Sequence, residues 1–280
     1  MTMKRLNYQQ LSKNSPCLCF SDKERRNRQQ IFTNLPRKRA FFNNTLKKFL
    51  IALSIGLFFA LNSIVFAQVD GLLPECRYDD IPAKYTDSKD WQISLLDTIY
   101  KLDENYAPSD LVNLSTIGFD KRFSLRDFVI DDLVKLLKAA KEAGNPLGIQ
   151  SSYRSYAYQK STFNYWQEKL GQAEALLTSA RAGHSEHQLG TTVDFKSLTG
   201  LAPWDYNDWA TTPTGAWLKE NAHKYGFVMS YPKNKKELSC YSYEPWHYRY
   251  IGIEYATTVY ESQLTLREWL WSLADYLHQE

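Results

Sequence analysis

Two short segments combine residue types that can bind a metal ion and use it for hydrolysis. The first, SEHQLGTTVDF, places His187 seven residues before Asp194, and the second, EPWH, places Glu244 three residues before His247. A catalytic zinc ion takes three protein ligands and leaves a fourth position for water. A carboxylate outside the ligand set then acts as general base. Each residue alone is more often a cap, turn or surface side chain, but together they predict a Zn²⁺ site with Glu244 as the base.

The hydrophobic pattern predicts the elements that must position these side chains. Apolar residues at helical spacing follow Ser124, whose S-L-R-D sequence resembles a capping box, and Gly144 ends this predicted helix. Short strands mixed irregularly with helices predict the α+β class: a single domain with a small, mostly antiparallel sheet flanked by helices. The other predicted helices are 156–180, broken near Gly171, 213–225, and one capped by Thr265; the predicted strands are 148–153, 191–196, 227–231 and 246–251.

A hydrophobic segment precedes this domain. Residues 49–67, FLIALSIGLFFALNSIVFA, carry no charge, follow two lysines and end in a pattern similar to a signal-peptidase site. The length and basic flank predict a membrane-targeting helix, either a signal peptide or an uncleaved anchor. A basic flank stays in the cytoplasm, so we expect the rest of the chain to be extracytoplasmic, in the periplasm or cell wall space.

The charge is unevenly distributed along the 280 residues. Residues 1–48 hold 12 Lys and Arg against 2 Asp and Glu, a balance of +10, and the whole-chain counts of 34 and 31 leave −7 for the remainder. The acidic body gives no electrostatic reason to expect nucleic acid as a partner. The basic head predicts a disordered cytoplasmic tail, or a translation start that lies further along the chain.

These observations divide the chain into four parts. We expect a basic head at 1–45, a signal peptide or anchor at 46–67, an irregular lead-in at 68–95 and the catalytic domain at 96–280, acting as a monomer. Two cysteines, Cys76 and Cys240, lie in the exported part. In an oxidising compartment they are either a disulfide or two small buried thiols.

Several separated motifs resemble one family. The pattern of Ser185, His187, Gly190 and Asp194, together with Glu244-Pro-Trp-His247, is similar to the VanY-type D-alanyl-D-alanine carboxypeptidases. Those belong to a zinc peptidase group that also includes D-Ala-D-Ala dipeptidases. The segment SSYRS at 151–155 resembles a further motif of the group, and the likeness covers roughly residues 100–270 in the right order.

The resemblance implies a zinc-dependent carboxypeptidase that removes the C-terminal D-alanine from peptidoglycan stem peptides, with D,D or L,D specificity left open. It implies His187, Asp194 and His247 as Zn²⁺ ligands and Glu244 as the catalytic base. It implies that Arg154 binds substrate and steadies the oxyanion, and that Gln159 and Ser185 help to hold the terminal carboxylate. A guanidinium with hydroxyl and amide donors suits a free carboxylate.

The sequence departs from the family pattern at a few positions. Thr192 replaces an Ala beside the ligand strand, Ser152 replaces a Gly, Ala182 replaces a Pro, and Cys240 replaces a Gly. None of these removes a ligand or the base. They concern substrate preference more than catalysis.

Other functions fit the sequence less well. A serine peptidase would use the S-x-x-K pattern of Ser230 to Lys233, but that pattern should begin a helix and Pro232 opposes one. The alternative from another class is a catalytically inactive wall-binding module of the same fold. Three further histidines are expected to be structural or exposed: His184, His223 and His278.

Overall fold

The computed structural model describes residues 73–83 and 90–277. The predicted basic head and membrane-targeting segment lie outside these residues. Within the described part of the chain, no helix combines the length and the apolar character needed to cross a membrane.

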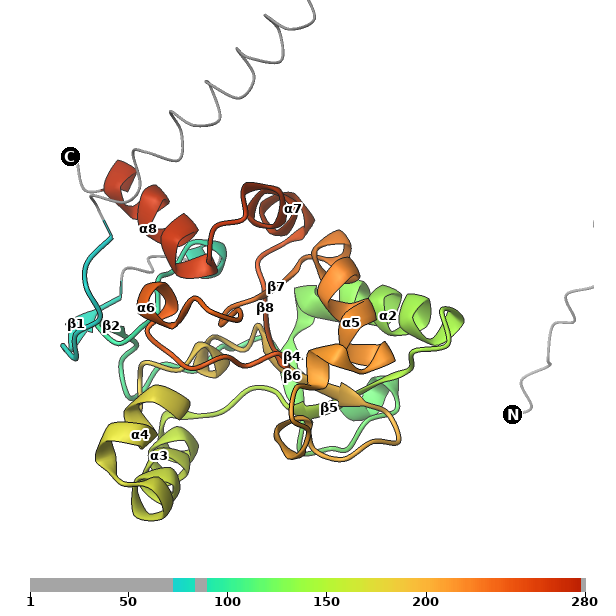
Figure 1. Ribbon diagram of the computed structural model, residues 1–280, viewed down its shortest axis with the longest axis horizontal. Coiled ribbons are helices and arrows are strands. Elements are labelled where there is room, and N and C mark those ends of the chain that lie inside the picture. Colours follow the sequence, from blue (N-terminus) through green and yellow to red (C-terminus); the bar gives the residue numbers. More distant parts are fainter. Residues whose placement is uncertain (1–72, 84–89, 278–280) are drawn as a thin grey trace, which may run out of the picture. The chain divides into compact units, whose positions relative to one another are not determined.

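A four-stranded antiparallel sheet forms the centre of the described domain (Figure 1). Its strand order is β5-β6-β8-β7, so β6 and β8 are neighbours in the middle although about fifty residues separate them in the chain. A parallel pair, β1–β2, and an antiparallel pair, β3–β4, come earlier in the sequence. The strands are β1 (Ile81–Pro82), β2 (Tyr100–Lys101), β3 (Leu111–Asn113), β4 (Ser124–Arg126), β5 (Leu147–Ser151), β6 (Thr192–Ser197), β7 (Phe227–Met229) and β8 (His247–Tyr250).

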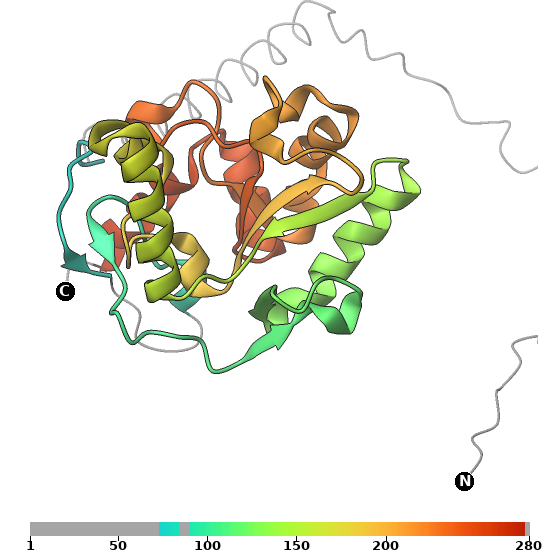
Figure 2. The same ribbon diagram turned by 90° about the horizontal axis from the view of Figure 1, so that it is seen from below.

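The helices lie on two sides of this sheet. In both ribbon views the pair α3–α4 lies on the opposite side of the domain from α2 and α5 (Figures 1 and 2). With the sheet between them, these elements confirm the α+β class predicted from the sequence. The helices are α2 (Asp127–Glu142), α3 (Tyr156–Leu170), α4 (Gln172–Thr178), α5 (Pro213–Asn221), α6 (Lys236–Ser239), α7 (Ile253–Ser262) and α8 (Leu266–Leu277).

The two middle strands alternate between the core and a polar face. Val193 and Phe195 of β6, with Tyr248 and Tyr250 of β8, belong to the main hydrophobic cluster that α2 and α5 cover. Because side chains alternate along a strand, the residues between them point the other way. Those residues are polar and still buried, which marks this face as the candidate site: Thr192, Asp194, His247 and Arg249.

The N-terminal part of the described chain is fastened to the rest. Cys76 and Cys240 form a disulfide across 164 residues of sequence, which is one of the two states that the sequence left open. Arg267 of α8 donates through Nε to Asp97 Oδ2 at 2.6 Å, and both side chains are buried. Residues near 76 and 97 are therefore bonded to parts of the domain that lie far away in sequence.

One predicted helix start is wrong and another is confirmed. Ser124 begins strand β4, which pairs with β3, and helix α2 begins at Asp127 without a side-chain cap. Strand pairing overrides the local capping signal there. At Thr265, by contrast, the capping box forms, because the Thr265 N–H donates to the Glu268 carboxylate and the Glu268 N–H donates to Thr265 Oγ1.

Candidate metal centre and active site

The pairing of β6 with β8 brings two of the predicted ligands together. Asp194 lies directly opposite His247 in the antiparallel register, and Val193 lies opposite Tyr248. Opposite residues on one face of such a pair have β-carbons about 5 Å apart. The alternation that sends Val193 into the core therefore sends Asp194 and His247 to the same polar face.

A tight turn brings the third predicted ligand to this face. His187 lies in the 3₁₀-helix η3 (Glu186–Leu189), which ends at Gly190 with a positive φ of 73°. A β-carbon at Gly190 would lie 3.0 Å from side-chain atoms of Arg126 and Leu111. Only glycine fits both the backbone conformation and the space. The chain then enters β6 at once, so His187 and Asp194 stay close together.

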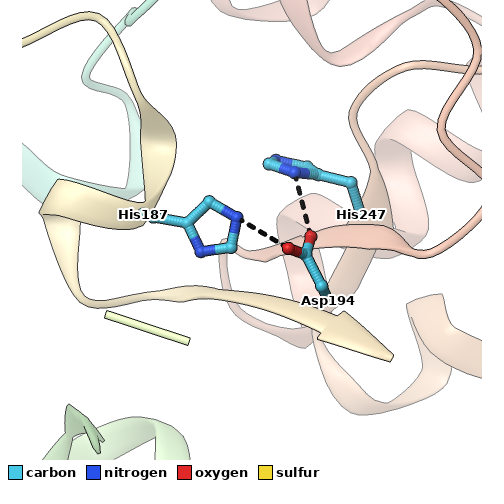
Figure 3. A group of neighbouring side chains, drawn as sticks. All are labelled: His187, Asp194 and His247. Carbon is cyan, nitrogen blue, oxygen red and sulfur yellow. Dashed lines mark ion pairs between the residues drawn. The ribbon is translucent and has the colours of Figure 1, made fainter. Parts of the chain in front are cut away.

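The three side chains converge on one point (Figure 3). His187 Nε2 lies 3.3 Å from Asp194 Oδ2, and His247 Nδ1 lies 3.3 Å from Asp194 Oδ1. One donor atom from each residue lies within 4.8 Å of the others. All three residues are buried, so the cluster is not a solvated group of surface charges.

Zinc suits this donor set. His187 Nε2 and Asp194 Oδ1 are buried and have no hydrogen-bond partner among the described residues. Buried polar atoms without a partner are rare and point to a missing ligand. Two imidazole nitrogens and one carboxylate are typical of a catalytic zinc site, which keeps a fourth position open.

Hydrogen bonds and local charges prepare the individual ligands. His187 Nδ1 lies 2.7 Å from the Ser152 carbonyl oxygen, so this nitrogen carries the proton and Nε2 faces Asp194 with a free lone pair. Burial, helped by the Arg154 guanidinium, lowers the pKa of His187 to about 4. His187 is therefore neutral near pH 7, as a metal ligand must be. Burial opposes ionisation of Asp194, but the electrostatic effect of His187 and the close polar contacts with both histidines outweigh it and hold the pKa of Asp194 well below the usual range.

Glu244 lies beside the ligands without joining them. Its Oε2 is 3.5 Å from His247 Nδ1, and 17% of its side chain is exposed to the cavity. Burial raises the pKa of Glu244 to about 7. A carboxylate whose pKa lies near the working pH is well suited to accept and return a proton.

The remaining predicted site residues line the same cavity, whose volume is about 920 Å³. Arg154 follows β5 and donates through Nη1 to Gln159 Oε1 at 2.8 Å, while its Nη2 lies 3.4 Å from Asp194 Oδ2. Its Nε is buried and has no hydrogen-bond partner in the described structure. Gln159 of α3 is fully buried and donates to the Ala180 carbonyl oxygen at 2.7 Å. Ser185 lines the cavity two residues before His187.

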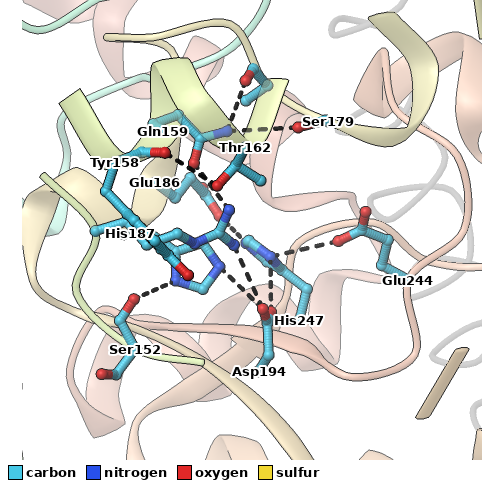
Figure 4. A network of polar contacts seen from close by, with 12 residues as sticks. Ser152, Tyr158, Gln159, Thr162, Ser179, Glu186, His187, Asp194, Glu244 and His247 are labelled. Carbon is cyan, nitrogen blue, oxygen red and sulfur yellow. Dashed lines mark hydrogen bonds and ion pairs between the residues drawn. The ribbon is translucent and has the colours of Figure 1, made fainter. Parts of the chain in front are cut away.

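Sequence reasoning missed two residues behind the ligands. Glu186 Oε2 lies 2.9 Å from His247 Nε2 (Figure 4). Glu186 Oε1 accepts from Arg249 at 3.1 Å. The alternation of side chains along strand β8 is the sequence feature that could have identified these two residues. An arginine two residues after His247 must share its face, and a buried arginine needs a carboxylate partner.

Other residues singled out in the sequence serve the fold. His184 bonds to the Asp97 carbonyl oxygen and to Asp80 Oδ1, which ties the catalytic loop to the N-terminal segment. His223 stacks on Tyr260 with ring centroids 3.7 Å apart. The prediction for His278 lies outside the described residues. Lys233 forms an ion pair with Asp208, and Ser230 donates its hydroxyl hydrogen to Glu186, so the two residues do not form a serine–lysine catalytic pair.

Two of the departures from the family pattern have a structural account. Ser152 Oγ accepts a hydrogen bond from the Ser124 N–H at 3.0 Å, so this hydroxyl helps to fix the backbone whose carbonyl holds His187. Thr192 is fully buried, and its Oγ1 has no hydrogen-bond partner among the described residues. Thr192 therefore fills space beside Asp194 without bonding to it.

An aspartate and a histidine on paired antiparallel strands, with a second histidine and a glutamate from adjoining segments, define a zinc-dependent hydrolase site on an α+β domain. Comparison with known proteins agrees with this class. The family profile of VanY, described as D-alanyl-D-alanine carboxypeptidase, matches residues 122–253.

The chain is also similar to curated proteins that are named as carboxypeptidases. The chain is 38% identical over 184 residues to the putative carboxypeptidase YodJ of Bacillus subtilis (strain 168), covering 63% of this chain and 66% of the relative. It is 32% identical over 196 residues to a D-alanyl-D-alanine carboxypeptidase of Enterococcus faecalis (strain ATCC 700802 / V583), covering 66% of this chain and 67% of that protein. The chain thus spans about two thirds of the length of these relatives.

Solved structures share the fold. The LD-carboxypeptidase LdcB is 34% identical, with a TM-score of 0.57 and coverage of 68% of this chain and 93% of LdcB. A mutant of the vancomycin resistance D,D-pentapeptidase VanY in complex with Zn(II) is 29% identical, with a TM-score of 0.55 and coverage of 64% of this chain and 99% of that one. The chain belongs to the VanY D-alanyl-D-alanine carboxypeptidase family.

Proposed function

We propose that this protein is a zinc-dependent carboxypeptidase that removes the C-terminal D-alanine from peptidoglycan stem peptides. One observation carries the proposal: His187, Asp194 and His247 meet in the lining of a large cavity, beside a Glu244 carboxylate with a raised pKa. The names of the relatives, among them D-alanyl-D-alanine carboxypeptidases and an LD-carboxypeptidase, support the substrate class.

The metal site provides a Lewis acid for the reaction. When bound by His187, Asp194 and His247, a Zn²⁺ ion polarises the scissile carbonyl and lowers the pKa of water. Hydrogen bonds hold the side chains of His187 and His247, and Asp194 lies opposite His247 in the strand pair, so the donor atoms of all three residues converge without the ion.

Glu244 is the proton carrier in this proposal. Ionised Glu244 accepts a proton from the attacking water and passes it to the leaving amino group of D-alanine, because it lies outside the ligand set and faces the cavity. Burial keeps its pKa near 7, so that the carboxylate both accepts and releases a proton near neutral pH.

Arg154 contacts the substrate in this proposal. Its guanidinium has one donor, Nε, without a partner, and only a long 3.4 Å contact to Asp194. The peptide's terminal carboxylate, or the oxyanion that develops on the scissile carbonyl, gives these donors a charged acceptor. Gln159 holds the guanidinium from behind, and the Ser185 hydroxyl adds a further donor on the cavity wall.

We propose an extracytoplasmic location for the catalytic domain. The disulfide between Cys76 and Cys240 supports this, because such bonds persist in oxidising compartments. Residues 49–67 provide either an anchor or a removed signal peptide. Recovery of active full-length protein from the cytosolic fraction would contradict this location.

Release of D-alanine tests the proposed function. The purified protein is incubated with pentapeptide and tetrapeptide stems, and mass spectrometry follows the loss of one alanine residue from each. Loss from the pentapeptide shows cleavage of a D,D bond, and loss from the tetrapeptide shows cleavage of an L,D bond. A zinc-loaded protein that releases alanine from neither substrate would overturn the proposal.

A further inference from the structure

Glu186 is a buried carboxylate that the reaction itself does not use. It is 3% exposed, and both of its oxygens have partners within the protein. Oε2 accepts from Ser230 Oγ at 2.6 Å and lies 2.9 Å from His247 Nε2, while Oε1 accepts from Arg249 Nη1 at 3.1 Å. Burying a carboxylate is costly unless it is paired and hydrogen-bonded, and the contacts with Ser230, His247 and Arg249 meet this need at both oxygens.

We infer that Glu186 is a positioning residue that selects the metal-binding nitrogen of His247, and that Arg249 fastens Glu186 to the N-terminal segment 91–94. This inference rests on the zinc site of the proposed function. Glu186 is not among the zinc ligands that the sequence motifs indicate. Segment 91–94 lies outside residues 122–253, which match the family profile, and the inference gives this segment a role in the site.

The selection follows from hydrogen-bond chemistry. An ionised carboxylate only accepts, so His247 must donate to Glu186 from Nε2–H. In the neutral ring that binds a metal ion, the other nitrogen, Nδ1, then has the free lone pair, and this nitrogen faces Asp194 at 3.3 Å. His187 is set in the opposite sense, because its Nδ1–H donates to the Ser152 carbonyl oxygen and its Nε2 is free. The two rings therefore present different nitrogens to one metal ion.

Arg249 extends this arrangement to the N-terminal segment. Its side chain is fully buried, and Nη2 donates to the carbonyl oxygens of Trp91 and Ser94 at 2.8 Å each. The Trp91 ring is fixed in turn, since it stacks on Phe128 with centroids 4.3 Å apart. The carbonyl oxygens of residues 91 and 94 thus accept two hydrogen bonds from the guanidinium that holds Glu186, whose Nε has no hydrogen-bond partner among the described residues.

Replacement of Glu186 by Gln separates positioning from simple packing. The amide keeps the shape, and its oxygen still accepts from Arg249, but its NH₂ group then faces His247 Nε2. That contact favours the His247 tautomer with the proton on Nδ1, which removes the lone pair needed for zinc. Ser230→Ala is the matched control, because it removes a hydrogen bond to the same Glu186 oxygen but leaves the carboxylate in place.

The first test measures zinc affinity of the metal-free full chain in competition with a chromophoric chelator. We expect Glu186→Gln to bind Zn²⁺ about 10- to 100-fold more weakly than the wild type, as the loss of an orienting partner does elsewhere. We expect Ser230→Ala to stay within about threefold of the wild type. At saturating zinc, Glu186→Gln lowers kcat and leaves KM unchanged. A Glu186→Gln affinity within threefold of the wild type, or an equal loss in Ser230→Ala, overturns the inference.

A second measurement needs no variant and therefore does not depend on whether Glu186→Gln folds. Nitrogen-15 NMR of the zinc-loaded wild-type protein assigns the proton and the metal on each imidazole. We expect Nε2–H with metal on Nδ1 for His247, and the reverse for His187. Metal on Nε2 of His247 overturns the inference. The zinc affinity and the nitrogen-15 assignment are both measured without peptide release, so a protein with this ligation but no release of D-alanine contradicts the proposed function alone.

Discussion

Glu244 Oε2 lies 3.5 Å from His247 Nδ1, the nitrogen that also faces Asp194 across the strand pair. The candidate base is thus next to the ligand set, held by a backbone hydrogen bond from its N–H to the Tyr231 carbonyl oxygen. This closeness lets one side chain serve the reaction without occupying a ligand position. It also places a carboxylate in a site where burial opposes its ionisation.

We expect Glu244→Gln to retain zinc and to lose at least about a hundredfold in turnover. The substitution keeps the size of the side chain but removes the proton acceptor, and general base catalysis contributes on the order of 10² to 10⁴. Zinc content and the rate of D-alanine release, measured on the same sample, check this prediction. Near-normal turnover would mean that another group activates the water.

The same substitution should stabilise the metal-free protein at alkaline pH. Burial raises the pKa of Glu244 from 4.5 to about 7, so the folded state binds this proton more tightly than the unfolded state does. The stability that Glu244 contributes is complete below pH 4.5 and is lost as the pH rises through 7. We expect the advantage of Glu244→Gln in unfolding free energy to grow by about 1 to 3 kcal/mol between pH 5 and pH 8. Denaturation of both metal-free proteins at the two pH values measures it, and a constant difference contradicts it.

Removal of any single predicted ligand should abolish zinc binding. A site with three protein ligands has no spare, so Asp194→Ala and His247→Ala should each lose bound zinc and peptide release. Thr192→Ala is the matched control, because Thr192 lies on the same face of β6 and makes no side-chain hydrogen bond within the described structure. Metal analysis after dialysis is the measurement. Full occupancy in His247→Ala would show that the ligand assignment is wrong.

Much of the core architecture could be predicted from local patterns. Apolar residues recur at strand spacing in β6 and at helical spacing in α2. The capping box at Thr265 is visible in the sequence because its partner, Glu268, follows three residues later. The metal ligands could also be predicted from the sequence, because only a few residue types bind zinc. The sequence order of His187, Asp194 and His247 is enough to suggest a ligand set, although it says nothing about their distances.

The remaining features depend on contacts that are far apart in sequence. Ser124 begins a strand because β3 lies beside it, and no local signal shows that pairing. Glu186 is a polar residue in a short loop until Arg249 and His247 are known to surround it. The 164-residue separation of Cys76 and Cys240 hides their pairing in the same way.

Arg154→Lys should weaken recognition of the substrate without affecting the fold. Lysine keeps the charge but cannot donate along the two directions of a guanidinium. We expect kcat/KM to fall by the equivalent of about 1.5 to 3 kcal/mol, with unchanged zinc content. The measurement is the rate of release from stem peptides with a free or an amidated C-terminus.

The amidated peptide shows which group Arg154 contacts. If the guanidinium binds the terminal carboxylate, amidation slows the wild type far more than Arg154→Lys. If amidation slows both proteins equally, Arg154 does not contact the carboxylate, and its interactions are then those within the protein, with Gln159 and Asp194.

The disulfide should hold residue 240 in a backbone conformation that suits glycine better than cysteine. Cys240 has a positive φ of 66° and lies four residues before Glu244, at the end of α6. Breaking the bond with Cys76→Ser removes a cross-link over 164 residues, and we expect a loss of about 2 to 5 kcal/mol in unfolding free energy. Adding Cys240→Gly to Cys76→Ser should then recover about 1 kcal/mol relative to adding Cys240→Ser, because glycine adopts positive φ without strain. Chemical denaturation of the two double variants measures the difference. Equal stability of the glycine and serine forms would show that the left-handed conformation at residue 240 exists only while the disulfide imposes it.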